Sequence, residues 1–395
     1  MTSNEIKALD SANVMQTYGR FDAVIDHGEG ATLWSPEGKE YIDFTSGIGV
    51  NSLGYGNKKW ADAVYAQLIK LQHISNLYYS EPYAKVAAKL TERTGMADVF
   101  FANGGGESNE GAIKLARKYS FDKYGKGRSD IVTLYMSFHG RTITTLSATG
   151  QDVFHNYFFP FTEGFSFAEA NNIESVKNAC TEKTCAVMLE LVQGEGGVLP
   201  LDKQFVADVA ALCRERDMLL IVDEVQTGVG RTGTLFAFQQ YGILPDVVSF
   251  AKGIAGGLPF AGIMANEKCR SVLTPGTHAT TFGGNPVCAA GAYEVLCQLD
   301  DELLKSVAEK GRYISEKIMS WGIPAVTCVR GLGLMLGVVL KGAQPGAIAK
   351  KCVENGLLIL TAGSDALRML PPLVISYEEI DKGLSILKKT LEENT

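Results

Sequence analysis

Short apolar runs recur along the first two thirds of the chain, and amphipathic segments separate several of them. The segments DKQFVADVAALCRER and KWADAVYAQLIKL carry apolar residues at helical spacing. Continuous apolar strands that alternate with helices are typical of a mostly parallel sheet covered by helices on both faces. The pattern therefore predicts an α/β domain, whose strands are DVFFAN from Asp98, IVTLYM from Ile131, CAVMLELV from Cys185, MLLIVDEV from Met218, DVVSFAK from Asp246 and FAGIMAN from Phe260.

The two ends of the chain follow a different pattern. Near the N-terminus, ATLW and EYIDF alternate apolar and polar residues around PEGK, which predicts a hairpin. Beyond about residue 320, VRGLGLMLGVVL, LLILTA and ALRMLPP resemble strands with glycine and proline breaks, and YEEIDKGLSILKKTL has helical spacing. A chain of 395 residues is too long for one ordinary core. We expect a large domain over residues 51–290 and a smaller α+β domain over 291–395, which the N-terminal segment 1–50 joins.

Composition and charge narrow the classes of partner. Apolar residues make up 46% of the chain and charged residues 21%, as in an ordinary globular protein. The net charge of −7, without any cluster of Lys or Arg, argues against nucleic acid and anionic membranes as partners. No apolar run reaches the roughly 18 residues of a membrane span, and the first residues lack the features of a signal peptide. We therefore expect a cytoplasmic enzyme.

The cysteines argue against metal chemistry. The eight cysteines form no CxxC pair and only five histidines accompany them, so we expect no metal site. Cys288 and Cys297 lie in apolar runs, which predicts small buried side chains. We expect all eight to be reduced, structural thiols.

Two polar residues at the ends of predicted strands indicate amine chemistry. Lys252 closes the run DVVSFAK, and Asp223 lies near the end of the preceding run, LLIVDEV. In a parallel sheet, ligands gather at the carboxyl ends of the strands. Pyridoxal phosphate needs an amine that holds its aldehyde and a carboxylate that keeps its ring nitrogen protonated. Asp223 alone could cap a helix and Lys252 alone could be solvated, but the two together favour this cofactor.

The sequence NGGGESNEGAIKLARKY predicts a phosphate site. The strand DVFFAN runs into Gly104, Gly105 and Gly106, and a helix then begins. Free backbone amides at the start of a helix bind anions, and glycines let a phosphate approach closely. An ordinary strand–helix turn is the alternative. The loop lacks the GKS/T ending of a P-loop and does not fit GxGxxG, so a simple phosphate ester is the better candidate ligand.

Further segments after predicted strands carry candidate ligands. Phe138 in SFHGRT could lie over a flat ring or in the core, and Arg141 could bind a substrate carboxylate or lie on the surface. His139 has an ordinary explanation as a loop histidine. Glu190 and Glu195 in LELVQGEGGVLP would matter beside a cationic group but could equally be solvated. Two more candidates would not stand out on their own, Thr281 in THATTFGGNP and Arg368 in ALRMLPP.

Taken together, these motifs resemble the class III aminotransferases of pyridoxal-phosphate fold type I, and within that class the bacterial acetylornithine aminotransferases. The similarity runs from TYGRF at Thr17 to RMLPPL at Arg368. FHGRT, LSATGQ, QGEGG, DEVQTGVGRTG, AKGIAGG, TFGGNP and VRGLGLMLG occur in one order. The resemblance implies an α/β large domain, with a mostly parallel sheet of the seven-stranded type flanked by helices, and a smaller α+β domain from both termini.

The resemblance assigns cofactor-binding roles by matching position. It implies that Lys252 bonds covalently to pyridoxal phosphate and later moves a proton between substrate and cofactor. Asp223 would contact the pyridine nitrogen, and Gln226 the phenolic oxygen of the ring. The other implied contacts are backbone amides of Gly105 and Gly106 to the phosphate, Phe138 stacked on the ring, and Thr281, a phosphate ligand supplied by the neighbouring subunit of a homodimer.

The resemblance also implies substrate contacts. Arg141 would hold the far carboxylate in both half-reactions, whereas Arg368 would hold the near carboxylate of glutamate and otherwise pair with Glu195. Tyr18 and Ile48 align with positions near the substrate. The implied reaction moves the terminal amino group of N-acetylornithine to 2-oxoglutarate. Transaminases of ornithine, succinylornithine, succinyl-diaminopimelate or 4-aminobutyrate, an aminomutase on the same fold and an inactive cofactor-binding scaffold are the alternative hypotheses.

Two segments depart from the family pattern. The phosphate loop reads NGGGES, where the family usually has serine or threonine at position 104 and a small nonglycine residue at 106. The lost hydroxyl weakens the phosphate contact, and the added backbone freedom costs ordering entropy. Leu191 stands where proline is common, which leaves the pose of Glu190 and Glu195 open. The backbone donors remain, so we expect activity to persist.

Overall fold

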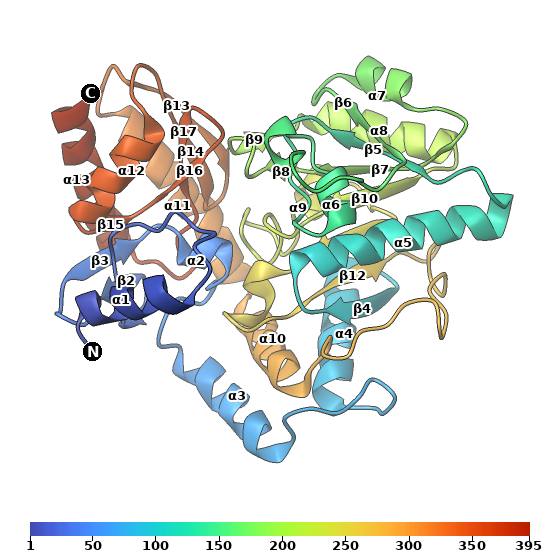
Figure 1. The fold of residues 1–395 in the computed structure, drawn as a ribbon, viewed down its shortest axis with the longest axis horizontal. Coiled ribbons are helices and arrows are strands. Elements are labelled where there is room, and N and C mark those ends of the chain that lie inside the picture. Colours follow the sequence, from blue (N-terminus) through green and yellow to red (C-terminus); the bar gives the residue numbers. More distant parts are fainter.

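The computed structural model describes residues 1–395, with a seven-stranded sheet at its centre (Figure 1). All neighbouring strands are parallel except for β12, which runs antiparallel to β11 and β4. This confirms the predicted α/β fold with a mostly parallel sheet. In sheet order, the strands are β4 (Asp98–Ala102), β12 (Ala261–Ala265), β11 (Val247–Phe250), β10 (Leu219–Asp223), β7 (Thr184–Glu190), β5 (Asp130–Leu134) and β6 (Phe165–Ala168).

Both faces of this sheet are buried, because alternate residues of a strand pack into different layers. On β10, Leu219 and Ile221 pack with apolar residues of α5, whereas Leu220 and Val222 belong to the core on the opposite face. This two-sided burial explains why the strands are continuously apolar. The main helices of this part are α3 (Lys58–Lys70), α4 (Glu81–Thr94), α5 (Gly105–Tyr124), α7 (Ile173–Ala179), α8 (Lys203–Glu215) and α10 (Pro286–Gln298).

A second body combines both ends of the chain (Figure 1). The predicted hairpin is confirmed as β2 pairs antiparallel with β3, and β15 from the C-terminal part then joins β3 in parallel. The domain boundaries at residues 50 and 290 stay a prediction. One sheet contains β1 (His27–Glu29), β2 (Thr32–Trp34), β3 (Glu40–Asp43) and β15 (Leu357–Leu358); the other contains β13 (Val326–Leu332), β14 (Met335–Leu340), β17 (Ala366–Met369) and β16 (Leu360–Ala362).

Helices and short elements complete the chain. The longer helices of the second body are α11 (Asp301–Met319), α12 (Pro345–Glu354) and α13 (Tyr377–Asn394). None of the helices combines the length and apolar character that crossing a membrane requires. The short elements are α2 (Ser46–Gly49), α6 (Ile143–Ser147), α9 (Ala237–Tyr241), β8 (Val192–Gln193), β9 (Leu199–Pro200) and the 3-10 helices η1 (Asp152–Phe154) and η2 (Lys252–Ala255).

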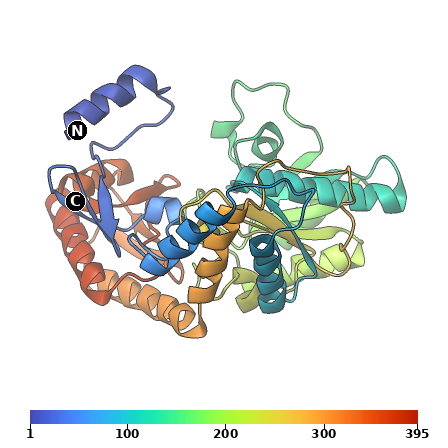
Figure 2. The same cartoon turned by 90° about the horizontal axis from the view of Figure 1, so that it is seen from below.

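The structure contains several elements that the sequence pattern did not predict, among them α1, β6, α10, α11 and α12, and it corrects one residue. The helix α1 (Ser3–Asn13) lies at the periphery without a buried residue, so it lacks the apolar stripe that predicts a helix (Figure 2). Its capping box of Thr2 and Glu5 is the signal that could have revealed it. The sequence pattern also did not predict the short edge strand β6. Cys297 is exposed rather than buried, because it lies in the last turn of α10.

Candidate active site

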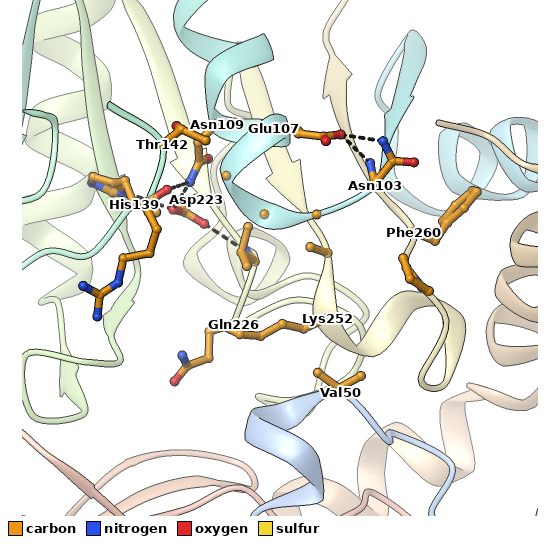
Figure 3. A pocket seen from close by; sticks show the side chains of 18 of the residues that line it. Val50, Asn103, Glu107, Asn109, His139, Thr142, Asp223, Gln226, Lys252 and Phe260 are labelled. Carbon is orange, nitrogen blue, oxygen red and sulfur yellow. Dashed lines mark hydrogen bonds and ion pairs between the residues drawn. The ribbon is translucent and has the colours of Figure 1, made fainter. Parts of the chain in front are cut away.

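A cavity of about 670 Å³ opens where the carboxyl ends of the central strands meet the start of α5 (Figure 3). Its wall combines residues from segments that are far apart in the sequence. Ligands of open parallel sheets bind at this edge. Eight of the candidate residues line the cavity, namely Gly105, Gly106, Phe138, Arg141, Glu190, Asp223, Gln226 and Lys252.

Lys252 has the features of an amine nucleophile. It begins η2 just beyond β11 and has a left-handed φ of +46°, a strained conformation for a residue with a side chain. Its Nζ makes no hydrogen bond or ion pair within the chain. Burial lowers the pKa of Lys252, although the charge of Glu195 acts in the opposite direction. A lysine with a lowered pKa is a better nucleophile at neutral pH, because more of it is uncharged.

Asp223 is buried and held by three hydrogen bonds. Its Oδ2 accepts from Asn109 Nδ2 at 2.7 Å and from His139 Nδ1 at 2.8 Å, as Figure 3 shows. Its Oδ1 accepts from the backbone N–H of Val225 at 2.9 Å. These contacts fix the orientation of the carboxylate in the cavity wall. The contact to the pyridine nitrogen that we expect for Asp223 requires such a fixed orientation.

Sequence reasoning missed part of this network. Asn109 also donates to the backbone oxygen of His139 at 2.7 Å, so it links α5 to the loop that carries Phe138. His139, which the sequence explains as an ordinary loop histidine, is buried and faces Asp223. The available signal for Asn109 was a polar residue one helical turn beyond the glycine loop. Nothing local in the sequence pointed to His139 as the partner of Asp223.

The start of α5 suits a phosphate. The helix has no side-chain cap at Gly104, and its first backbone bond runs from Ser108 N to Gly104 O, so the preceding amides have no partner within the helix. Free amides and the positive end of the helix dipole favour an anion. A Cβ at Gly105 would lie only 2.8 Å from Val225 Cγ1, so this glycine allows close packing. The residues present therefore fit the phosphate of the cofactor.

Arg141 is a cation without an anionic partner. Its exposed guanidinium makes no ion pair and lies 4.3 Å from the ring centre of Phe154 and 5.4 Å from that of Phe138. The two rings contact edge to face at a centre distance of 5.5 Å. The aromatic rings thus hold the guanidinium beside the cavity, where it can bind a carboxylate.

Arg368 is a buried cation that already has a partner. Its Nη1 lies 2.6 Å from Glu195 Oε1 and donates to Gln226 Oε1 at 3.2 Å, while its buried Nε has no partner. Burial acts to raise the pKa of Glu195, but the charge and hydrogen bonds of Arg368 and the charge of Lys252 together outweigh it, so the pKa lies below its ordinary value. The pair joins β17 to the loop after β7.

Glu190 is a buried acid that connects two loops of the site. Its Oε2 accepts from Phe138 N at 2.9 Å and its Oε1 accepts from Gly194 N at 3.2 Å. Burial raises the pKa of Glu190 to about 7. The solvated alternative for Glu190 is therefore wrong, since Glu190 is 5% exposed.

Five candidates lie outside the cavity wall of a single chain. Two of them, Glu195 and Arg368, reach it through the bond from Arg368 to Gln226. Thr281, Tyr18 and Ile48 are exposed, and none of them lines the cavity. Val50, close to Ile48, lines it instead. The roles of these residues stay predictions.

Comparisons with known proteins agree with this geometry. The family model for class-III aminotransferases matches residues 14–391. The acetylornithine aminotransferase of Haemophilus ducreyi is 49% identical over 100% of both chains, and the succinylornithine transaminase of Photorhabdus laumondii is 42% identical over 92% of each.

Solved structures extend the similarity to the whole fold. The ornithine aminotransferase from Toxoplasma gondii ME49 has a TM-score of 0.95 at 30% identity and covers 100% of this chain and 96% of its own. The N-acetylornithine aminotransferase from Stenotrophomonas maltophilia has a TM-score of 0.85 at 34% identity, with 98% of each chain covered. With a lysine, a buried acid and a phosphate-binding helix start around one cavity, the chain belongs to the class-III aminotransferases, a family of pyridoxal-phosphate-dependent transaminases.

Proposed function

We propose that this enzyme transfers the terminal amino group of N-acetylornithine to 2-oxoglutarate, giving N-acetylglutamate semialdehyde and glutamate in arginine biosynthesis. The observation that carries the proposal is the contrast between two cations at one site. Arg141 is unpaired, whereas Arg368 is neutralised by Glu195. A substrate with one carboxylate far from its reacting amine needs one free cation, and glutamate needs two. Relatives 41–49% identical to this chain carry the name acetylornithine aminotransferase.

The residues of the cavity have distinct roles in this proposal. When bound, pyridoxal phosphate supplies an electron sink for the carbon that carries the amine. Lys252 would hold the aldehyde of the cofactor and, as an uncharged amine, would then move a proton to or from the substrate carbon. Asp223 would hold the ring nitrogen, and Gln226 would contact the ring oxygen. Phe138 would cover the ring, and the amides at Gly105 and Gly106 would bind the phosphate.

The Arg368–Glu195 pair lets one site accept two substrates. A buried arginine without a counter-charge is costly, so Glu195 stabilises Arg368 while N-acetylornithine is bound. Glutamate brings a second carboxylate that replaces Glu195 on Arg368. Glu195 is partly exposed, with 30% of its side chain accessible, so it can move into water at modest cost. Tyr18 would close the substrate end of the cavity.

We further propose a cytoplasmic homodimer in which Thr281 contributes to the phosphate site of the partner. The loop around Thr281 carries Phe282, which is 63% exposed. Asn76 donates a hydrogen bond from Nδ2 to Gly283 O of this loop at 2.8 Å. The residues that follow Asn76, Leu77, Tyr78 and Tyr79, are exposed. Exposed apolar patches of this kind mark protein interfaces.

A panel of amine donors, assayed with the holoenzyme and 2-oxoglutarate, tests the reaction. We expect the highest kcat/KM for N-acetylornithine and strict dependence on the oxo-acid. Turnover without an oxo-acid would favour an aminomutase. Absence of any absorbance change of the bound cofactor with glutamate would indicate an inactive scaffold. Gel filtration with light scattering, together with Thr281→Ala, tests the dimer.

A further inference from the structure

A second cavity, of about 610 Å³, lies beside the active site. The proposed function assigns no role to this cavity. It is bounded by the segment after α6, by the loop after β7 and by the turn between β16 and β17. Its wall includes Gln151, Asp152, Phe154, Glu195, Thr361 and Ser364.

Two side chains connect this cavity with the active site. Phe154 lines the second cavity, and its ring lies 4.3 Å from the guanidinium of Arg141. Glu195 lines the second cavity too, and it pairs with Arg368, which bonds Gln226 in the wall of the first. A carboxylate held by Arg141 therefore lies next to Phe154. Substituents on the same carbon of the substrate are within reach of the second cavity.

The charges of this cavity have one sign. Its wall contains two acids, Asp152 and Glu195, and no lysine or arginine. Glu195 is compensated by Arg368, but the exposed carboxylate of Asp152 has no hydrogen bond or ion pair. A ligand group that ends in a carboxylate would be repelled by the charge of Asp152, because no cation in this wall neutralises it. A short neutral group would instead contact Phe154 and Val153 without that repulsion.

We propose that this cavity is the acyl subsite of the enzyme, and that Asp152 makes it selective for a short neutral acyl group over one that ends in a carboxylate. The inference rests on the proposed function, because Arg141 anchors the substrate carboxylate. It deepens that function by separating two substrates of the same reaction type. N-acetylornithine fits the subsite, and N-succinylornithine is disfavoured by charge.

The test is the ratio of kcat/KM for N-acetylornithine to that for N-succinylornithine, measured with holoenzyme and saturating 2-oxoglutarate. We expect the wild-type ratio to favour the acetyl substrate. The ratio should fall about fivefold in Asp152→Asn and roughly twentyfold in Asp152→Lys, in proportion to the charge change at a partly solvated site. Asp301→Asn removes an exposed, unpaired acid of α11 and should leave the ratio unchanged.

Salt provides a second readout that a purely structural role of Asp152 would not affect. Raising the ionic strength should narrow the acetyl preference of the wild type and have little effect on Asp152→Asn, because salt screens an exposed charge. A wild-type preference for the succinyl substrate, or a ratio that neither variant changes, would overturn the subsite. Failure of the wild-type cofactor to exchange an amine with glutamate would instead overturn the proposed function.

Discussion

Glu195 and Arg368 form a two-point ion pair, in which Nη1 lies 2.6 Å from Oε1 and Nη2 lies 3.3 Å from Oε2. Arg368 comes from β17 of the second body, and Glu195 from the turn between β8 and β9, which follow β7 of the central sheet. The pair therefore links the two bodies at the edge of the cavity. In the proposed function, the pair also determines which carboxylates the cavity accepts.

Removing the carboxylate of Glu195 should shift the choice of substrate. In Glu195→Gln, Arg368 loses its counter-charge. The kcat/KM for a ligand with two carboxylates should therefore rise relative to that for a ligand with one. We expect the kcat/KM ratio of glutamate to N-acetylornithine to rise roughly tenfold, since a charged hydrogen bond contributes about 1.5–3 kcal/mol. Glu354→Gln, which breaks an exposed pair with Lys351, is the matched control and should leave the ratio unchanged. An unaltered ratio in Glu195→Gln would contradict the exchange.

Replacement of Lys252 should abolish covalent attachment of the cofactor. In Lys252→Ala we expect no cofactor–protein adduct after borohydride reduction, detected by mass spectrometry, and loss of turnover by at least about 10³-fold. Lys310→Ala is a demanding control, because burial also lowers the pKa of Lys310, whose Nζ donates to Leu373 O outside the cavity. That variant should lose stability but keep the adduct. A reducible cofactor–protein adduct in Lys252→Ala would show that another residue attaches the cofactor.

The glycine loop should respond differently at its successive positions. A Cβ at Gly104 meets no atom within 4 Å, and the backbone there is extended, so Gly104→Ser fits and adds a hydroxyl near the phosphate site. We expect the cofactor Kd of the apoenzyme to fall roughly tenfold. Gly105→Ala should raise Kd, because its Cβ would lie 2.8 Å from Val225. Fluorescence titration with cofactor measures both, and a tighter Gly105→Ala variant would refute the packing argument.

Glu190 should make the stability of the enzyme depend on pH. Because burial raises its pKa to about 7, the folded state binds this proton more tightly than the unfolded state. Its contribution to stability is complete below the unfolded pKa, about 4.3, and is lost as pH rises toward 7. Relative to Glu190→Gln, the wild type should lose on the order of 3 kcal/mol of unfolding free energy across this window.

Urea denaturation at several pH values measures this effect. The unfolding free energies of the wild type and Glu190→Gln are compared at about pH 5, 6 and 7, with cofactor present throughout. Glu302→Gln, an exposed residue of α11, provides the control and should follow the wild type. A constant difference between wild type and Glu190→Gln would show that Glu190 does not titrate in this range.

Much of the fold was predictable from local pattern. Six of the seven central strands are recognisable as continuous apolar runs, because burial on both faces removes polar residues from them. The pattern does not show that β12 runs antiparallel to its neighbours, since strand direction depends on the connections and leaves no mark on a short apolar run. It missed β6, a short edge strand, for lack of such a run.

The sequence by itself determined the chemistry of this protein, because Asp223 ends a strand, Lys252 and the glycine loop each follow one, and strand ends meet at one edge of a sheet. Only the tertiary structure decided the partners of these residues. Asp223 is held from positions 84 and 114 residues away, and Arg368 pairs across 173 residues. Such contacts depend on how the packed layers meet, and local spacing contains no record of that.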